Sequence, residues 1–167
     1  MFREVKKNMR FSSRFGTAIH TLLIIHEGCK EQKVTSDFIA EKIGKSSVFV
    51  RTLLGDFKKA GVVYIAPRKE KEGTKLARPL NKITLFDIFE IVEPDHLKNL
   101  CETSTRIFHR CHAGQYVNEI ISGYLEDVID VVRAELKKTT LADTLASLEM
   151  REAASLHKNT RDLFPME

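Results

Sequence analysis

Two short helical patterns followed at once by a strand pattern constrain the fold of this chain more than any other feature of its sequence. In residues 35–44 and 46–61, apolar side chains recur every three or four positions, and each pattern begins with a hydroxyl residue and ends at a glycine. Hydroxyl residues favour the first position of a helix, and glycine favours the position after its end. From Val62 the pattern changes to the β-branched and aromatic run VVYIA, which is typical of a strand. This order predicts a helix-turn-helix followed by a β-hairpin, the arrangement of a winged helix-turn-helix.

The hairpin, or wing, is expected to have a charged loop. Pro67 ends the first strand, and a second short strand is expected at residues 76–78, directly before Pro79. The loop between them, residues 68–75, carries four cationic and two acidic side chains. The acidic residues weaken the wing as a basic patch.

Helices are predicted on both sides of this motif. The same periodicity marks residues 11–27, 84–92, 115–138 and 140–148. The fold class is therefore mainly α with a small β-hairpin: a winged helix-turn-helix head plus a long C-terminal dimerisation helix. The tail after residue 148 is polar with few apolar anchors, and we expect it to fray.

The longest pattern, residues 115–138, has an apolar stripe across about six turns, or roughly 36 Å. A three-helix head is too small to cover such a stripe, and a monomer would leave a large apolar patch exposed. We expect two copies of the chain to bury it against each other about a two-fold axis. The residues expected at this homodimer interface are Val117, Ile121, Tyr124, Leu125, Val128 and Val132.

The charge of the chain is divided unevenly along its 167 residues. Residues 1–80 hold 17 Lys and Arg against 8 Asp and Glu, whereas residues 81–167 hold 10 against 15. A basic half of this kind favours a polyanionic partner. The longest mostly apolar run, residues 17–26, is too short to span a bilayer, and the N-terminus lacks the apolar region of a secretory signal. We therefore expect a cytoplasmic protein with no membrane partner.

The second helix of the motif is expected to enter the major groove of double-stranded DNA. Arg51 lies one to two turns into this helix, and an arginine fork suits the O6 and N7 atoms of guanine. The alternative is that Arg51 is a solvated surface residue. Hydroxyls at the helix start suit phosphate groups, and cations on the wing suit the phosphate backbone or the minor groove. The residues expected to contact DNA are Ser46, Ser47, Val48, Arg51, Thr52, Lys58, Arg68, Lys69, Lys71 and Lys75.

Four segments of the chain resemble one family of regulators. They are MRFSSRFGTAIH (9–20), the helix pair (37–63), KLARPLNKITLFDIFEIVE (75–93) and TTLADTL (139–145). Together they resemble the Rrf2 family over about residues 9–148. The family consists of dimeric winged-helix transcription regulators, and it includes iron–sulfur and thiol-responsive repressors. The resemblance implies the same fold, DNA as the partner and a homodimer.

The chain departs from the family pattern in three places. Its wing has Gly73 alone where relatives often have a glycine pair, and it has Arg51 where several relatives have an acidic base-reading residue. Cluster-binding relatives place three cysteines between the wing helix and the long helix, and here only Cys101 and Cys111 lie there, nine residues apart. That spacing matches neither zinc nor common iron–sulfur ligand patterns. We therefore expect no cofactor and no metal; the alternative is a [2Fe–2S] cluster with ligands from outside this segment. Redox sensing by Cys101 or Cys111 stays open, because His109, Arg110 and His112 would favour a thiolate at Cys111.

These features predict a sequence-specific transcriptional regulator, a repressor, acting as a homodimer with thiol or small-molecule control. Residues 9–93 would form the DNA-binding domain, residues 94–148 a sensory loop and dimerisation helices, and residues 149–167 a frayed tail. The alternative is a winged-helix interaction module that binds RNA or a protein. An enzyme is not expected, because the chain has no Gly-rich phosphate loop and no G-x-S-x-G or H-E-x-x-H motif.

Overall fold

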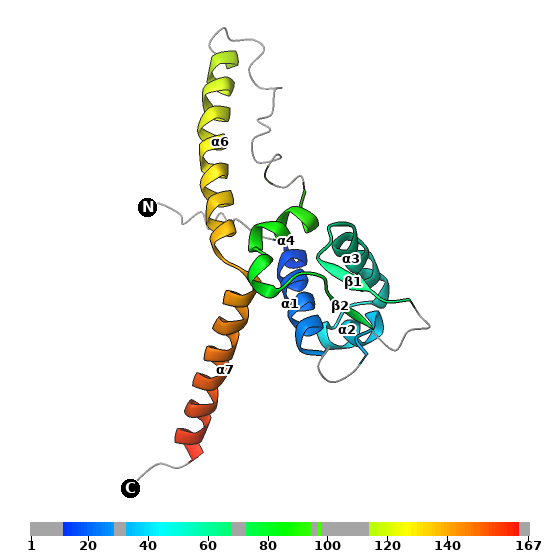
Figure 1. Ribbon diagram of the computed structural model, residues 1–167. Coiled ribbons are helices and arrows are strands. Elements are labelled where there is room, and N and C mark those ends of the chain that lie inside the picture. Colours follow the sequence, from blue (N-terminus) through cyan, green and yellow to red (C-terminus); the bar gives the residue numbers. More distant parts are fainter. Residues whose placement is uncertain (1–11, 29–32, 68–72, 95–96, 98–113, 164–167) are drawn as a thin grey trace.

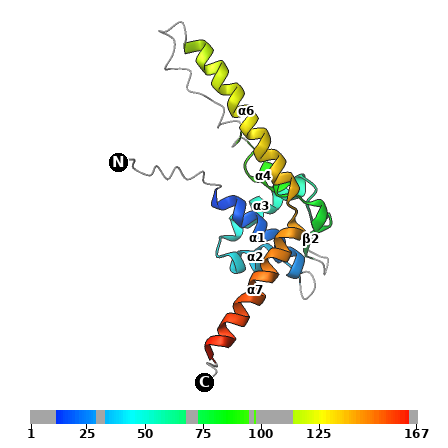
Figure 2. The same ribbon diagram turned by 90° about the vertical axis from the view of Figure 1, so that its left-hand side faces the viewer.

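The computed structural model describes residues 12–28, 33–67, 73–94, 97 and 114–163 (Figure 1). A head of short helices and one β-hairpin carries two long helices that extend away from it in different directions (Figures 1 and 2). No helix among the described residues is long and apolar enough to span a membrane. The elements of the head are α1 (Ser13–Gly28), α2 (Ser36–Ile43), α3 (Ser47–Lys59), β1 (Val63–Ile65), β2 (Thr74–Leu76), the 3-10 turn η1 (Leu80–Lys82) and α4 (Leu85–Val92).

The helix-turn-helix is fixed by local capping, as the sequence predicts. The Thr35 hydroxyl accepts a hydrogen bond from the backbone N–H of Phe38 at 3.2 Å, and this caps α2. Gly44 ends α2 in the left-handed conformation, with φ of 63°, which glycine adopts without a steric cost. The Ser46 hydroxyl then accepts from the N–H of Phe49 at 3.2 Å and starts α3. Thr35, Gly44 and Ser46, which lie within twelve residues, therefore set the ends of the two helices and the turn between them.

A single apolar core joins the three helices of the head to α4 and the hairpin. Leu22 of α1, Ile39 of α2 and Phe57 of α3 are completely buried in it. Phe15 of α1 and Phe89 of α4 meet edge to face, with ring centroids 5.6 Å apart. One face of α3 is part of this core, and packing on that face fixes the position of the helix in the head.

The wing is an antiparallel hairpin in which Val63 pairs with Leu76 and Ile65 with Thr74. The second strand was predicted at residues 76–78, and that prediction is wrong by two residues. The register is set by contacts that no local pattern reveals: the backbone N–H of Thr74 donates to the Val34 carbonyl at 2.8 Å, while the side chain of Arg78 turns to the end of α3. Lys75 is consequently a strand residue and not a loop residue.

The two long helices are α6 (Gly114–Lys138) and α7 (Leu141–Leu163). Their junction pairs with the start of α4, since Leu85 N–H donates to the Thr139 carbonyl at 2.9 Å and Leu141 N–H to the Ile83 carbonyl at 2.8 Å. The Thr140 hydroxyl and backbone N–H both donate to Asp143, which holds the pKa of that carboxyl below its usual value. The backbone N–H of Asp143 in turn donates to the Thr140 hydroxyl, so the two residues cap the start of α7.

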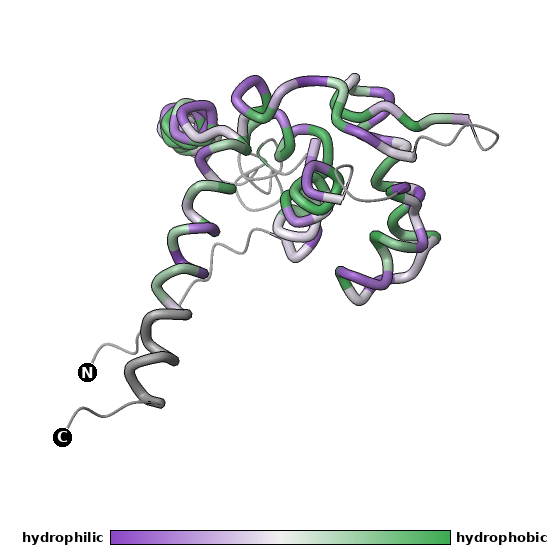
Figure 3. Tube along the Cα trace, turned by 60° about the horizontal axis from the view of Figure 1, so that its bottom comes forward, coloured by the Kyte–Doolittle hydropathy of each residue, from purple (hydrophilic) through white to green (hydrophobic). Residues whose placement is uncertain are grey.

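The last helix is longer than the sequence analysis predicted, because α7 continues beyond residue 148 to Leu163. Its second half is rich in Ala, Leu, Glu and Arg, which favour helix even without burial. Figure 3 shows polar and apolar residues alternating along the coloured part of α7. Fraying of this tail stays a prediction.

Candidate nucleic-acid interface

The exposed face of α3 is the centre of the candidate interface. Val50, Leu53, Leu54 and Phe57 are buried and hold the helix against the head. The opposite face is exposed, and Val48 is 67% exposed there. Among the residues predicted to contact DNA, Ser46, Val48, Arg51, Thr52 and Lys58 are exposed and Ser47 is half-buried.

One ion pair ties this helix to α1. Arg14 Nη2 lies 3.0 Å from Asp56 Oδ2, and both side chains are partly exposed. An ion pair of this kind contributes at most about 1 kcal/mol to stability. The buried side chains of α3 therefore set its rotation about its axis, and the ion pair adds a weaker contact with α1.

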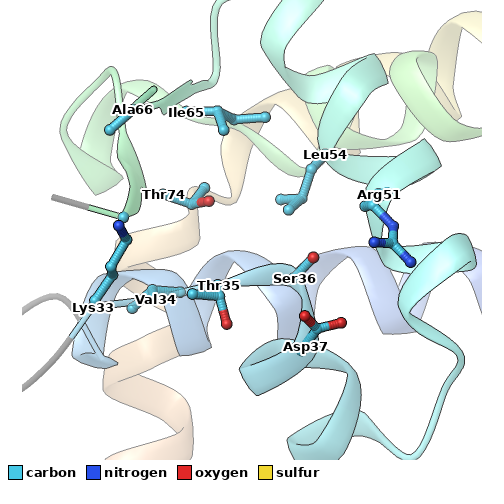
Figure 4. A pocket seen from close by; sticks show the side chains of 11 residues that line it. Lys33, Val34, Thr35, Ser36, Asp37, Arg51, Leu54, Ile65, Ala66 and Thr74 are labelled. Atoms are coloured by element: carbon cyan, nitrogen blue, oxygen red, sulfur yellow. The ribbon is translucent and has the colours of Figure 1, made fainter. Parts of the chain in front are cut away.

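An open pocket of about 440 Å³ lies between α2, α3 and the wing. Arg51 and Leu54 line it from α3, Ile65 from β1, and Ser36 and Asp37 from the first turn of α2. Figure 4 shows the Arg51 guanidinium on the side of the pocket where Ser36 and Asp37 lie. The lining is mixed, since the Arg51 cation and the Ser36 hydroxyl lie with the Asp37 carboxylate and the apolar side chains of Leu54 and Ile65.

Sequence reasoning missed several pocket residues. Lys33, Thr35, Ser36 and Asp37 line the pocket from the residues that lead into α2 and from its first turn, and Thr74 lines it from β2. The signal for the first group was present: the run TSD before an apolar pattern marks a helix N-terminus, where backbone N–H groups favour anions. Thr74 could not have been found, because its place depends on the shifted strand register.

The wing is described only at its base. Lys75 lies in β2 opposite Tyr64, with its Nζ 5.3 Å from the centre of the Tyr64 ring. The other predicted wing residues, Arg68, Lys69 and Lys71, lie outside the described residues. Their contacts with DNA stay a prediction.

The base of the wing depends on one glycine. A Cβ added to Gly73 would lie 2.6 Å from the backbone nitrogen of Val34 and even nearer to its carbonyl oxygen. We expect Gly73→Ala to push β2 away from Val34, to break the hydrogen bond from Thr74 N–H, and to lower the free energy of unfolding by about 1–3 kcal/mol. Thermal unfolding and DNA binding measure the two effects.

Gly16→Ala is the matched control for this prediction. A Cβ at Gly16 in α1 meets nothing within 4 Å, so alanine should raise the free energy of unfolding by about 0.5–1 kcal/mol. Equal stability changes at the two glycines would contradict the role given to Gly73.

The predicted dimer residues divide between two surfaces of α6. Val117, Ile121, Tyr124 and Val128 are exposed, and Tyr124 is 68% exposed. Leu125 is half-buried, and Val132 packs against the core of its own head beside the buried Ile129. Ile129 was not among the residues predicted at the dimer interface. The apolar face of α6 is therefore wide, with one edge on the head and the other edge open.

The candidate redox residues, Cys101 and Cys111, lie outside the described residues. Among the described residues, no group of three His, Cys, Asp or Glu could hold a metal ion. An iron–sulfur cluster commonly takes four cysteine ligands, and the segment before α6 supplies two cysteines. A cluster would therefore need ligands from outside that segment.

Comparison with known proteins decides the family of this winged helix. The model of the Rrf2 family, described as an iron-dependent transcriptional regulator, matches residues 11–147. The chain belongs to the Rrf2 family. YwnA of Bacillus subtilis, named as an HTH-type transcriptional regulator, is 24% identical over 137 residues, which cover 82% of this chain and 98% of YwnA.

Solved structures of similar proteins confirm the winged-helix fold of this Rrf2 chain. A transcriptional regulator from Lactobacillus plantarum superposes with a TM-score of 0.67 at 20% identity, over 88% of this chain and 97% of that one. IscR of T. potens superposes with a TM-score of 0.62 at 22% identity, over 86% and 91%. Family membership makes the protein a DNA-binding transcriptional regulator and not an enzyme.

Proposed function

We propose that this Rrf2-family protein is a homodimeric, sequence-specific repressor that acts on DNA in the cytoplasm. The observation that carries the proposal is the exposed face of α3, which lies beside the wing and an open pocket. A regulator of this kind recognises a short sequence by inserting one helix into the major groove while the wing contacts the backbone.

The contacts would be divided between the helix and the wing. Arg51, held on a packed helix, is proposed to contact base edges, with Val48 and Thr52 beside it. Ser46, Ser47, Lys58 and the wing residues Arg68, Lys69, Lys71 and Lys75 are proposed to contact phosphates. Lys75 lies against the Tyr64 ring, so its contribution should be smaller than that of the loop cations.

The exposed edge of α6 supports the homodimer. Its open side chains lie along one side of a 25-residue helix that extends away from the head (Figure 1). A two-fold axis across this edge would bury the same residues of both copies. Two recognition helices related in this way contact two half-sites about 34–36 Å apart, which is one turn of DNA.

Control of the repressor is proposed to act through the segment between α4 and α6. This segment joins the head to the proposed dimerisation helix, so a chemical change in it could alter the spacing of the two recognition helices. Cys111 between Arg110 and His112 has the cationic neighbours that favour a reactive thiolate. Thiol oxidation or a small molecule is the proposed signal.

Selection of bound duplexes from random DNA, with and without a mild oxidant, tests these statements together. We expect a pseudo-palindromic site with half-sites one helical turn apart, and weaker binding after oxidation. Double-stranded RNA of the same sequence should not compete. Selection of a single half-site would contradict the dimer, and failure to enrich any sequence would contradict specific DNA binding.

The protein purified under anaerobic conditions is expected to be colourless, since two thiolates in one segment are too few for a cluster. Absorption spectra and iron and sulfide analysis measure this. Iron and sulfide in stoichiometric amounts, lost in Cys101→Ser or Cys111→Ser, would show that other residues complete a ligand set.

A further inference from the structure

One side chain joins the end of the recognition helix to the outgoing strand of the wing. Arg78 follows β2 by two residues, and its Nε donates to the Gly61 carbonyl at 3.0 Å. Its Nη2 donates to the Ala60 carbonyl at 2.9 Å. Ala60 is the C-cap of α3, and Gly61 follows it with φ of 65°. A single guanidinium therefore bridges both carbonyls of the turn where α3 ends.

This turn is the natural hinge between α3 and the wing. The last carbonyls of a helix lack partners within the helix, and a cation there also complements the negative end of the helix dipole. Only three residues separate α3 from β1. A guanidinium bound to two of their carbonyls restricts rotation at this turn, whereas water on the same carbonyls would not.

Backbone hydrogen bonds hold the incoming side of the wing, since Val62 N–H donates to the Phe57 carbonyl of α3 at 2.9 Å. Next to Arg78, Ala77 N–H donates to the Val62 carbonyl at 2.9 Å. At the other end of β2, Thr74 N–H is bonded to Val34, which leads into α2 and not into α3. The Arg78 side chain adds a link from the residues after the outgoing strand β2 to the turn that ends α3.

We propose that Arg78 is a positioning residue for DNA recognition: it sets the orientation of the wing relative to α3 and does not itself contact DNA. This inference rests on the proposed function of α3 and the wing. Both elements must engage one duplex at the same time, and a wing that is already oriented loses less conformational freedom on binding. Arginine suits this role better than lysine, since its planar fork holds two oxygens in fixed geometry while an ammonium is a single point.

DNA binding by Arg78→Ala, Arg78→Lys and the control Lys82→Ala tests the proposal. Lys82 is an exposed cation on η1, so its loss changes the net charge equally. We expect Arg78→Ala to bind the selected duplex about tenfold more weakly, Arg78→Lys to lie between it and the wild type, and Lys82→Ala to stay within about twofold. The salt dependence of Arg78→Ala binding should keep the wild-type slope, because no phosphate contact is lost.

Two outcomes would overturn the proposal. A salt slope lower by about one unit in Arg78→Ala would make Arg78 a phosphate contact. Wild-type affinity in this variant would mean that the wing needs no such link. If the alanine variant does not fold, Arg78→Lys alone decides, since it retains the charge and loses only the second hydrogen bond.

Hydrogen exchange in the DNA-free protein separates this inference from the proposed function. The Ala77 amide should exchange faster in Arg78→Ala, whereas the Ile88 amide in α4 should not change. Unchanged exchange at Ala77 would contradict the positioning role even if DNA binding is normal. A wild-type protein that binds no duplex, with Ala77 responding as expected, would instead remove the proposed function and leave the structural link intact.

Discussion

Replacement of Ile121 and Val128 by aspartate is expected to convert the protein into a monomer and to weaken binding to its preferred DNA site by at least about 100-fold. Both side chains lie on the exposed edge of α6, so the change leaves the core of the head intact. Burial of four carboxylates in a two-fold interface is strongly unfavourable. A monomer binds one half-site and loses the gain of about 10²–10⁴ that linked binding of the second half-site provides.

Glu126→Lys is the matched control. Glu126 is two residues from Tyr124, which places it about 200° around the helix on the polar face. This variant should stay dimeric and should bind DNA at least as well as the wild type. Light scattering at micromolar concentration measures the mass, and a monomeric wild type would remove the prediction.

The width of the apolar face of α6 explains what the sequence could and could not predict there. A helix that covers one core needs a stripe of about 100°. In α6 the apolar positions from Ile120 to Ile129 span about 180° when projected at 100° per residue. The sequence therefore contains evidence for two apolar partners. It could not assign Val132 to the head and Val128 to the open edge, because this division depends on how the Thr139–Leu141 connection docks on α4.

Local chemistry explains why the helix-turn-helix was predicted correctly. Thr35, Gly44 and Ser46 cap backbone groups that lie within a few residues of them in the sequence. Their roles follow from their own conformational preferences. The register of β2 and the contact of Arg78 with α3 depend on residues 17 to 40 positions away. Strand propensity near Leu76 is the same in either register, so only the tertiary contacts select one.

Arg51→Ala is expected to weaken binding to the preferred site by roughly 5- to 150-fold, which corresponds to about 1–3 kcal/mol, and to leave binding to random DNA nearly unchanged. The guanidinium extends from a helix whose other face is fully packed, so its position relative to the groove is well defined. A side chain held in this way can form two hydrogen bonds with one guanine, and the wrong base leaves them unmade. Competition between selected and random duplexes measures the ratio.

The variants Lys58→Ala and Arg51→Lys distinguish the loss of a base contact from the loss of a positive charge. Lys58 is on the same helix and equally cationic, and as a phosphate contact its loss should weaken binding to all duplexes and lower the salt slope by about one unit. Arg51→Lys retains the charge but not the fork, so it should bind random DNA normally and lose most of the discrimination.

If Arg51→Ala instead weakens all duplexes equally, Arg51 is a phosphate contact at the edge of the pocket beside Ser36 and Asp37. Base recognition would then belong to Val48 and Thr52, the other exposed side chains of this face, whose smaller groups discriminate through the thymine methyl and single hydrogen bonds.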